Sequence, residues 1–514
     1  MNRRVVIIIN CEGKSDNLAG VHGTCDSWRA PLPPRGRDLS KTSLSQWETM
    51  KHVVVVGAGI SGLAVAYRLH RLAPDVAVTV LEQGSRPGGT VWTERRDGFQ
   101  VEVGPNGFLD TKPTTLSLCR DLNLAEQLVM ASAAASKNRY LFLDGRLRML
   151  PNSLGSFVRT DLLSWRGKLS LLAERWRFSR PPDSDESVAA FARRRTSREV
   201  ADVLADALVT GIHAGDPELL SIRAAFPRVA ALEAEYGSVL KGMARAARQR
   251  RAEAQAQGQP YQRPGQLWSC QAGLRVLIET LSNTLPQSPV CGVTVRRVER
   301  APAVNQWLVW GEGQDHWRSD SVVLACPAYQ QAALLADLDE PLAERLGGIA
   351  YNRVAVVALG YRQCDVPMPL DGFGYIAPQR TRRDVLGVQW CSSTYPGRAP
   401  EGHVLLRALC GGWHRADVVS WADDRLLAAV REELKQALHL AAPPVFHHII
   451  RWQRAIPQYH LGHLDRVAWI EQRLSLHPGL FVTGNALHGV ALNDCTEQGE
   501  RVAGLVRAYL RQRD

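Results

Sequence analysis

Three glycines in the pattern Gly57-x-Gly59-x-x-Gly62 directly follow the apolar run His52–Val56. In a turn from strand to helix, the first glycine permits the tight turn, the second lets the backbone approach a pyrophosphate, and the third lets the helix pack closely on the strand. Glu82 stands at the end of a second apolar run, where a carboxylate accepts both ribose hydroxyls of an adenosine and repels a 2′-phosphate. The pattern predicts a dinucleotide site on a helix N-terminus, made by Gly57, Ala58, Gly59, Ile60, Ser61, Gly62, Glu82 and Gln83.

Two further glycine-rich segments are expected to reach the same cofactor. Arg86-Pro-Gly88-Gly89 follows Glu82 and lets the backbone and a guanidinium approach the dinucleotide a second time. Near the C-terminus, Leu480–Thr483 is typical of a strand that runs into Gly484, and Gly489–Asn493 leads into a final helix over about 494–511. Free N–H groups and the helix dipole make such a helix N-terminus favourable for negative charge.

This combination resembles the flavoproteins with two dinucleotide-binding domains, a group that contains amine oxidases, phytoene desaturases and protoporphyrinogen oxidases. The resemblance implies FAD and not NAD as the cofactor. It also implies that the C-terminal helix points at the N1–C2=O edge of the flavin and stabilises the anionic reduced ring. One departure is Asn485, where the group often has Asp. The further flavin-binding residues that the resemblance implies are Arg86, Gly89, Gly104, Pro105, Asn106, Gly107, Val295 (through its backbone, to the adenine), Gly484, Val490, Ala491 and Leu492.

Within this group the sequence is most similar to the protoporphyrinogen oxidases, along nearly the whole chain from Met50. Each matching stretch is weak alone, but together they follow the order of that family. The stretches are 101–110 (VEVGPNGFLD), 137–140 (KNRY), 210–217 (TGIHAGDP), 225–227 (AFP), 236–238 (YGS), 371–374 (DGFG), 456–459 (IPQY) with Gly462-His463, and 489–495 (GVALNDC).

The resemblance implies a six-electron oxidation of a porphyrinogen to a porphyrin. A hydride leaves a methylene bridge for flavin N5, and O2 reoxidises the flavin to give hydrogen peroxide, three times over. The hard chemistry belongs to the cofactor, so we expect no catalytic acid or base and no metal. Arg139 matches the arginine that binds a substrate propionate, which a planar guanidinium holds bidentately. Gly211 matches a glycine that lets the backbone approach the substrate.

Three functions stay open at this point. The first is oxidation of protoporphyrinogen IX, which the stretch 104–110 (GPNGFLD) favours. The second is a coproporphyrinogen III oxidase of the same flavin type, whose substrate differs only in carrying propionates in place of vinyl groups. The third is a non-catalytic protein that binds flavin and porphyrin. The intact glycine motif, Arg139 and the C-terminal loop argue against the third.

We expect an α/β fold (α+β overall), with a Rossmann-type FAD-binding domain, a substrate domain on a mixed sheet and a helical middle domain. The FAD-binding domain is predicted from 50–113, 262–335 and 452–514, and the substrate domain from 114–150 and 336–451. Residues 151–261 form the predicted helical domain. Residues 1–49 are a disordered extension or an over-long start, because Met50 stands immediately before the first buried run.

Composition and charge restrict the environment of the protein. The 514 residues are 45% hydrophobic and 22% charged, and the ten cysteines form no Cys-x-x-Cys pair. We therefore expect a cytoplasmic protein without a disulfide framework or a zinc site. The net charge of +11 favours an acidic substrate or an anionic membrane surface, since the sequence holds no nucleic-acid module. Leu150–Leu172, an apolar stretch with basic flanks, predicts either peripheral contact with the inner face of the cell membrane or, equally, a helix that packs on its own domain. A homodimer is compatible with the resemblance.

Overall fold

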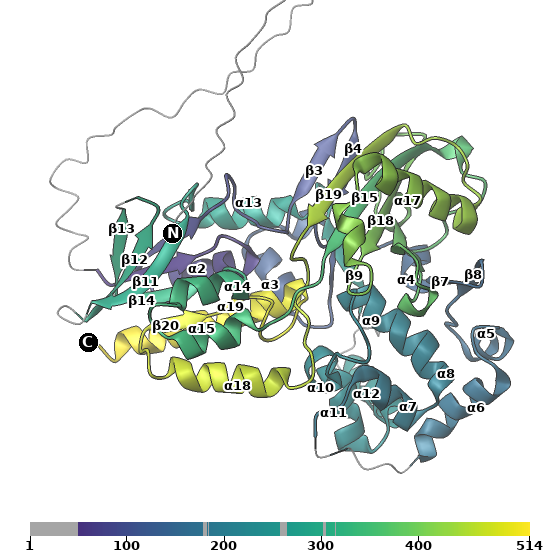
Figure 1. Cartoon of the computed structure of the whole chain (residues 1–514), viewed down its shortest axis with the longest axis horizontal. Helices are drawn as coiled ribbons and strands as arrows, with labels where there is room; N and C mark the ends of the chain where they lie inside the picture. The colour runs from purple at the N-terminus through teal and green to yellow at the C-terminus, as the bar shows by residue number, and fades with distance from the viewer. Residues whose placement is uncertain are drawn as a thin grey trace, which may run out of the picture. The chain divides into compact units, whose positions relative to one another are not determined.

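The computed structural model describes residues 50–177, 182, 184–256, 265–301, 305–313 and 315–513. The chain divides after Thr49, and the residues from Met50 onward form its second unit. The prediction for residues 1–49 lies outside the described residues. All that follows concerns the second unit, whose elements are labelled in Figure 1.

A five-stranded parallel sheet, in the order β10-β2-β1-β14-β20, forms the base of the predicted dinucleotide site. Its central strand alternates between two cores: Val53 and Val55 pack on one side, Val54 and Val56 on the other. Because both faces are covered, the strand is a continuous run of valines. The strands are β1 (His52–Val56), β2 (Ala77–Glu82), β10 (Val290–Cys291), β14 (Ser321–Leu324) and β20 (Leu480–Val482).

Helices cover both faces of this sheet. On one face lie α2 (Ile60–Leu72), α13 (Arg275–Thr284) and α19 (Leu492–Arg511). Helices α2 and α19 pack closely because Gly499 brings the α19 backbone against Ala64. On the other face lie α14 (Ala328–Leu335), α15 (Glu340–Gly347), α18 (His463–Leu474) and the three-stranded sheet of β11 (Val295–Ala301), β12 (Gln306–Gly311) and β13 (His316–Ser319).

The chain leaves the parallel sheet after Cys291, turns at Gly292 with a φ of 78°, and enters the separate antiparallel sheet at Val295. A left-handed φ is a conformation that favours glycine, so Gly292 is the residue at which the direction changes.

The second large sheet is mixed and has seven strands, in the order β19-β15-β18-β17-β16-β7-β8. Helix α17 (Asp423–Leu438) packs on one face through Leu426, Val430, Leu434 and Leu438. The strands are β7 (Tyr140–Leu143), β8 (Arg146–Met149), β15 (Val354–Arg362), β16 (Gly374–Ile376), β17 (Val385–Trp390), β18 (His403–Gly411) and β19 (Phe446–Trp452).

The other face of this sheet meets the parts of the chain that carry the predicted site. The antiparallel hairpin of β3 (Thr93–Arg96) and β4 (Phe99–Glu102) packs there through Phe99 and Val101. Helix α9 (Asp206–His213) packs there through Gly211 on Ile376. A small sheet lies beside them, with β5 (Phe108–Leu109), β9 (Leu267–Cys270) and β6 (Leu128–Met130) in that order.

The middle of the chain is helical, and Figure 1 shows its helices gathered beside the seven-stranded sheet. They are α5 (Leu154–Arg159), α6 (Trp165–Ala173), α7 (Val188–Arg195), α8 (Arg198–Val200), a π-helical turn (Ala201–Ala205), α9, α10 (Ile222–Ala225), α11 (Pro227–Tyr236) and α12 (Val239–Ala256). The short helices α3 (Thr114–Asp121), α4 (Ala133–Lys137) and α16 (Cys391–Thr394) connect strands elsewhere. Within the described residues, no helix combines the length and apolarity needed to cross a membrane.

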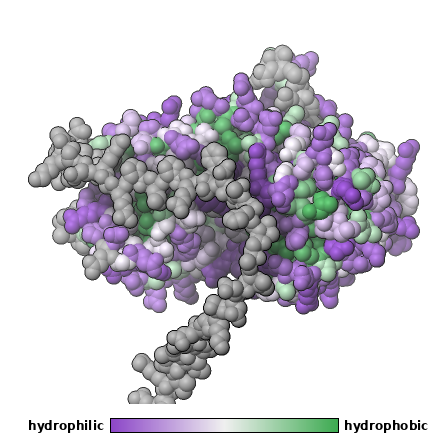
Figure 2. All heavy atoms as spheres, turned by 90° about the horizontal axis from the view of Figure 1, so that it is seen from above, coloured by the Kyte–Doolittle hydropathy of each residue, from purple (hydrophilic) through white to green (hydrophobic). Residues whose placement is uncertain are grey.

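The stretch Leu150–Leu172 is not one amphipathic helix. It forms α5 and α6, and each begins at a serine N-cap, Ser153 and Ser164. Leu162 and Leu163 between them are buried in the core. Lys168 is also buried and donates to the carbonyl of Val158 at 2.8 Å. The exposed apolar surface of α5 and α6 is formed by other residues of these helices. Figure 2 shows a different face of the molecule, where hydrophilic side chains predominate and apolar ones gather in separate small areas.

Candidate flavin and substrate site

The glycine turn after β1 has the geometry of a phosphate-binding site. Gly57 has a φ of 106°, and Gly62 lies so close to the turn that a Cβ there would stand 2.0 Å from the Gly57 carbonyl oxygen. Gly59 is the N-cap of α2 without a side-chain cap, and a Cβ there would meet open space. The first N–H groups of α2 are therefore available to an anion.

Glu82 ties this turn to the end of β2. Its carboxylate accepts the N–H of Ala58 at 2.9 Å and the N–H of Gly84 at 2.8 Å, one on each oxygen. Each carboxylate oxygen can accept a further hydrogen bond, which leaves capacity for ribose hydroxyls. Gln83 lies exposed beside it and accepts from the side chain of Gln330.

The second glycine pair lies against the first. The N–H of Gly88 donates to the carbonyl of Ala58 at 2.8 Å, and Gly89 faces the Cα of Gly59. Arg86 lies over the ring of Trp92, 4.2 Å from its centroid, and donates to the Pro87 carbonyl. Burial lowers the pKa of Arg86 below its ordinary value, but a guanidinium stays charged.

Segment 104–107 has two features of a ligand contact. It holds a buried amide without hydrogen-bond partners, and its two glycines lie very close to neighbouring atoms. The side chain of Asn106 is buried, yet neither its oxygen nor its nitrogen has a hydrogen-bond partner among the described residues. A buried amide without partners is costly, so it is typical of a group that bonds to a ligand. At Gly104 a Cβ would stand 2.1 Å from the Thr90 carbonyl oxygen, and at Gly107 2.4 Å from the Tyr395 hydroxyl. Pro105 lies half-buried between them.

The C-terminal loop closes on the same region. Gly484 has a φ of 127° directly after β20, and the loop runs through Val490 and the N-cap Ala491 to Leu492, the first residue of α19. The carboxylate of Asp494 accepts the N–H of Ala491 at 3.1 Å and pairs with Lys112 at 2.7 Å. Lys112, which was not predicted from the sequence, lies between the carboxylates of Asp494 and Glu497 at the start of α19 and donates to both.

Arg139 and Gly211 each lie by the β7–β16 pair of the seven-stranded sheet. Arg139 immediately precedes β7 and lies over the ring of Phe373 at 5.5 Å. Its side chain is exposed, and no carboxylate among the described residues pairs with it. Gly211 packs on Ile376, which stands beside Leu141 in the β7–β16 pair. Both predicted substrate residues therefore lie near β7 and β16.

Strand pairing connects the β16 end of the seven-stranded sheet with segment 104–107. Gln389 stands opposite Gly374 in β16 and opposite Arg407 in β18, and directly opposed residues share a face. Arg407 donates to the Gly104 carbonyl, and to Gln389 at 2.9 Å. The face that carries Arg407 is the one against which α9 and the segment 104–107 lie.

A buried charge network, not predicted from the sequence, lies behind segment 104–107. Glu102 lies 3.5 Å from Arg398, accepts the Thr93 hydroxyl at 2.8 Å, and is completely enclosed with Arg398 and Arg407. Burial raises the pKa of Glu102 and lowers that of Arg407. Removing one partner of such a group leaves an unpaired buried charge, which is strongly destabilising. No sequence signal pointed to this set, because its members are about 300 residues apart in the chain.

Val295 lies outside the parallel sheet. It begins β11, and the backbone group that meets the end of β2 is the N–H of Val293, which donates to the Glu82 carbonyl at 2.9 Å. The described residues thus form two predicted groups, the glycine turns with Glu82 and, by the β7–β16 pair, Arg139 and Gly211. Segment 104–107 lies against the same face of the seven-stranded sheet as Gly211.

This arrangement fits a dinucleotide that carries a flavin, and comparison with known proteins agrees. The chain belongs to the family of flavin-containing amine oxidoreductases, whose model matches residues 60–507. It is an oxidoreductase, and its cofactor is FAD. The predicted fold class, cofactor and enzyme class are confirmed.

Among its relatives are porphyrinogen oxidases. The chain is 33% identical to chloroplastic protoporphyrinogen oxidase of Nicotiana tabacum, over 89% of this chain and 85% of that protein. It is 30% identical to coproporphyrinogen III oxidase of Bacillus subtilis, over 90% of this chain and 98% of that protein. A crystal structure from Exiguobacterium named as a protoporphyrinogen oxidase superposes with a TM-score of 0.75 at 27% identity, covering 89% of this chain and 99% of that one.

Proposed function

We propose that this chain oxidises protoporphyrinogen IX to protoporphyrin IX with FAD and O2. FAD, when bound, supplies the two-electron acceptor for each of the three dehydrogenations and returns to its oxidised form with O2. The observation that carries the proposal is Arg139, an exposed guanidinium without a carboxylate partner among the described residues. It immediately precedes β7, the strand next to β16, on which Gly211 packs.

The residues of the chain would bind and orient and would transfer no proton. Arg139 would hold a propionate, because a guanidinium and a carboxylate match in two parallel hydrogen bonds. Gly211, which carries no Cβ, would let the macrocycle lie close to α9. The buried amide of Asn106 would bond to the cofactor. The macrocycle would then lie between α9 and the ring that accepts its hydrogen.

Coproporphyrinogen III is the second candidate substrate, favoured by the two bacterial relatives named coproporphyrinogen III oxidase, which are 30% and 31% identical. Aerobic turnover of both porphyrinogens, followed by porphyrin fluorescence, separates the two. A higher kcat/KM for protoporphyrinogen IX supports the proposal, and a higher value for coproporphyrinogen III replaces it. Bound FAD with no turnover of either substrate would support the non-catalytic alternative.

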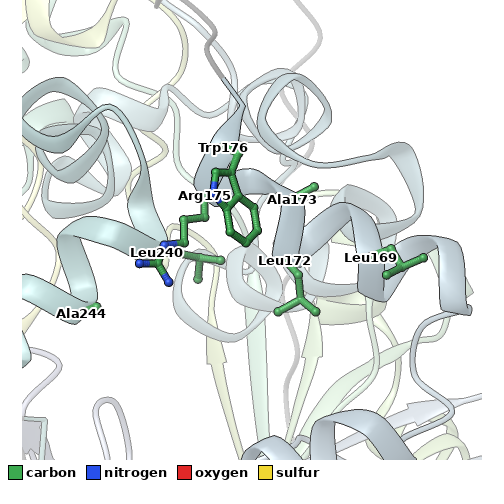
Figure 3. A pocket seen from close by; sticks show the side chains of 7 residues that line it. All are labelled: Leu169, Leu172, Ala173, Arg175, Trp176, Leu240 and Ala244. Atoms are coloured by element: carbon green, nitrogen blue, oxygen red, sulfur yellow. The ribbon is translucent and has the colours of Figure 1, made fainter.

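We further propose that the helical part of the chain contacts an anionic membrane surface from one side. Exposed apolar side chains gather on α5, α6 and the turn after it: Leu154, Val158, Trp165, Leu169, Leu172 and Trp176. Figure 3 shows Trp176 and three leucines around a groove of about 550 Å³ that α12 completes. The exposed Arg159, Arg166 and Arg175 lie among them, and basic residues around apolar ones suit anionic lipid.

Vesicle binding tests this surface. The double variant Trp165→Ser, Trp176→Ser should lose most of its co-sedimentation with phosphatidylglycerol vesicles, whereas Leu476→Ser, which changes an exposed leucine after α18, should bind as the wild type does. Unchanged binding of the double variant would place the contact elsewhere. Equal binding to phosphatidylcholine vesicles would refute the role of the arginines.

A further inference from the structure

The motif Ile456-Pro-Gln-Tyr459 with Gly462-His463 matches the porphyrinogen oxidases, but neither the flavin nor the substrate residues predicted above include it. In the structure this segment follows β19 and leads into α18. Gln458, Tyr459 and His463 are all buried. The segment lies between the end of α9 on one side and the loop 484–491 on the other.

Tyr459 holds both ends of the C-terminal loop. Its hydroxyl donates to the Asn485 carbonyl at 2.5 Å and accepts the N–H of Gly489 at 2.8 Å. Only a protonated hydroxyl can do both, and burial keeps the pKa of Tyr459 well above its ordinary value. The loop between these two bonds is the one that enters the N-terminus of α19.

His463, the first residue of α18, supports the same loop. Its ring stacks on that of Tyr459 with centroids 4.1 Å apart, and its Nε2 donates to the Leu487 carbonyl at 3.1 Å. Burial lowers the pKa of His463 to about 4, so the ring is neutral at pH 7. Three hydrogen bonds from two stacked rings thus fix residues 485–489.

Gln458 bonds in the opposite direction, to the end of α9. Its side-chain amide donates to the His213 carbonyl at 3.0 Å, and Asn352 donates to the same carbonyl at 2.7 Å. These bonds satisfy the last turn of the helix that carries Gly211, where helix carbonyls otherwise have no partner. The Gln458 oxygen also packs on Gly215, where a Cβ would stand 2.3 Å from it.

We propose that Gln458 and Tyr459 are positioning residues that set the spacing between the flavin loop and the substrate helix. Gln458 bonds to the end of α9 and Tyr459 bonds to loop 485–489, so two consecutive residues connect the substrate helix with the flavin loop. The substrate half of this inference rests on the proposed function, whereas the flavin half rests on the cofactor alone.

Two conservative substitutions separate the halves. Tyr459→Phe keeps the stacked ring and removes only the two hydroxyl bonds, so the Kd for FAD, measured by flavin fluorescence on the apoprotein, should rise about 10-fold or more. Gln458→Leu should leave that Kd unchanged and raise KM for the porphyrinogen at least 3-fold. Tyr375→Phe is the control, because Tyr375 is buried in the core on the α17 face of the sheet, and its FAD affinity should equal that of the wild type.

The outcomes distinguish this inference from the proposed function. Wild-type FAD affinity in Tyr459→Phe refutes the flavin half, whatever the substrate is. Wild-type KM in Gln458→Leu, with the wild type active, refutes the substrate half. An inactive wild type that binds FAD would refute the proposed function and the substrate half, while the Tyr459→Phe titration would still decide the flavin half. If Tyr459→Phe does not fold, His463→Phe keeps the stacking and removes the Leu487 bond, and unchanged FAD affinity there refutes the flavin half.

Discussion

Replacement of Gly59 by alanine tests the dinucleotide turn more sharply than any other single change. At this position the backbone has φ −69° and ψ 174°, an extended conformation that alanine adopts without strain. A Cβ there would meet no atom of the protein within 4 Å. The folded apoprotein should therefore tolerate the methyl group, with a loss of about 1 kcal/mol or less from the weaker N-cap.

The cofactor should not tolerate it. The space that the methyl group enters is the space into which the pyrophosphate must come to reach the N–H groups of α2. Inserting a methyl group into a filled contact costs about 1–3 kcal/mol, which is roughly a 5- to 150-fold increase in the Kd for FAD. Flavin fluorescence titration gives the Kd, and thermal unfolding without FAD gives the stability.

Gly504→Ala is the matched control, since Gly504 is an exposed residue of α19 with no atom within 4 Å of its added Cβ. Alanine there should leave the Kd for FAD unchanged and stabilise the helix by about 0.5–1 kcal/mol. FAD affinity equal to wild type in Gly59→Ala would refute the placement of the pyrophosphate at this turn. A large stability loss without FAD would refute the open space seen in the structure.

Three further predictions concern single residues. Glu82→Gln should raise the Kd for FAD about 10-fold, because a neutral amide oxygen accepts ribose hydroxyls more weakly than a carboxylate; an unchanged Kd would remove Glu82 from the ribose site. Arg139→Ala should raise KM for the porphyrinogen about 10-fold or more with FAD content intact, and unchanged kinetics for both porphyrinogens would remove it from the site. Burial alone would raise the pKa of Asp339, but hydrogen bonds from Arg473 and His477 hold it below its ordinary value. Its contribution to stability is therefore present above about pH 4 and lost as the pH falls through the folded pKa, so urea midpoints of Asp339→Asn should be lower than wild type at pH 7 and converge with it in acid.

The parts of the site that sequence alone could predict are those whose constraints are local. Gly57, Gly62 and Glu82 lie within one strand–helix–strand unit, where Gly57 is required by its φ of 106° and Gly62 by its contact with the Gly57 carbonyl. The fold class followed from the same unit and from the valine-rich strand. Arg139 and Gly211 came from resemblance, and their roles stay predictions, as do the domain boundaries.

The parts that sequence could not predict depend on contacts between distant segments. The burial of Glu102 with Arg398 and Arg407 is decided by the packing of a hairpin on a sheet, and no local pattern marks a charged residue as buried. The start of α6 has a local signal, the N-cap serine Ser164, but the burial of Leu162 and Leu163 just before it depends on packing against distant segments. The role of Tyr459 became visible only when the loop that it holds was in place.

The most direct test of the account is the stoichiometry of the reaction. Purified full-length chain, loaded with FAD, is mixed with protoporphyrinogen IX, and porphyrin fluorescence, oxygen consumption and hydrogen peroxide are recorded together. Each porphyrin formed should consume three O2 and yield three hydrogen peroxide, at a rate well above that of the same mixture without enzyme. Porphyrin formation no faster than that background, from a protein with its flavin bound, would contradict the account.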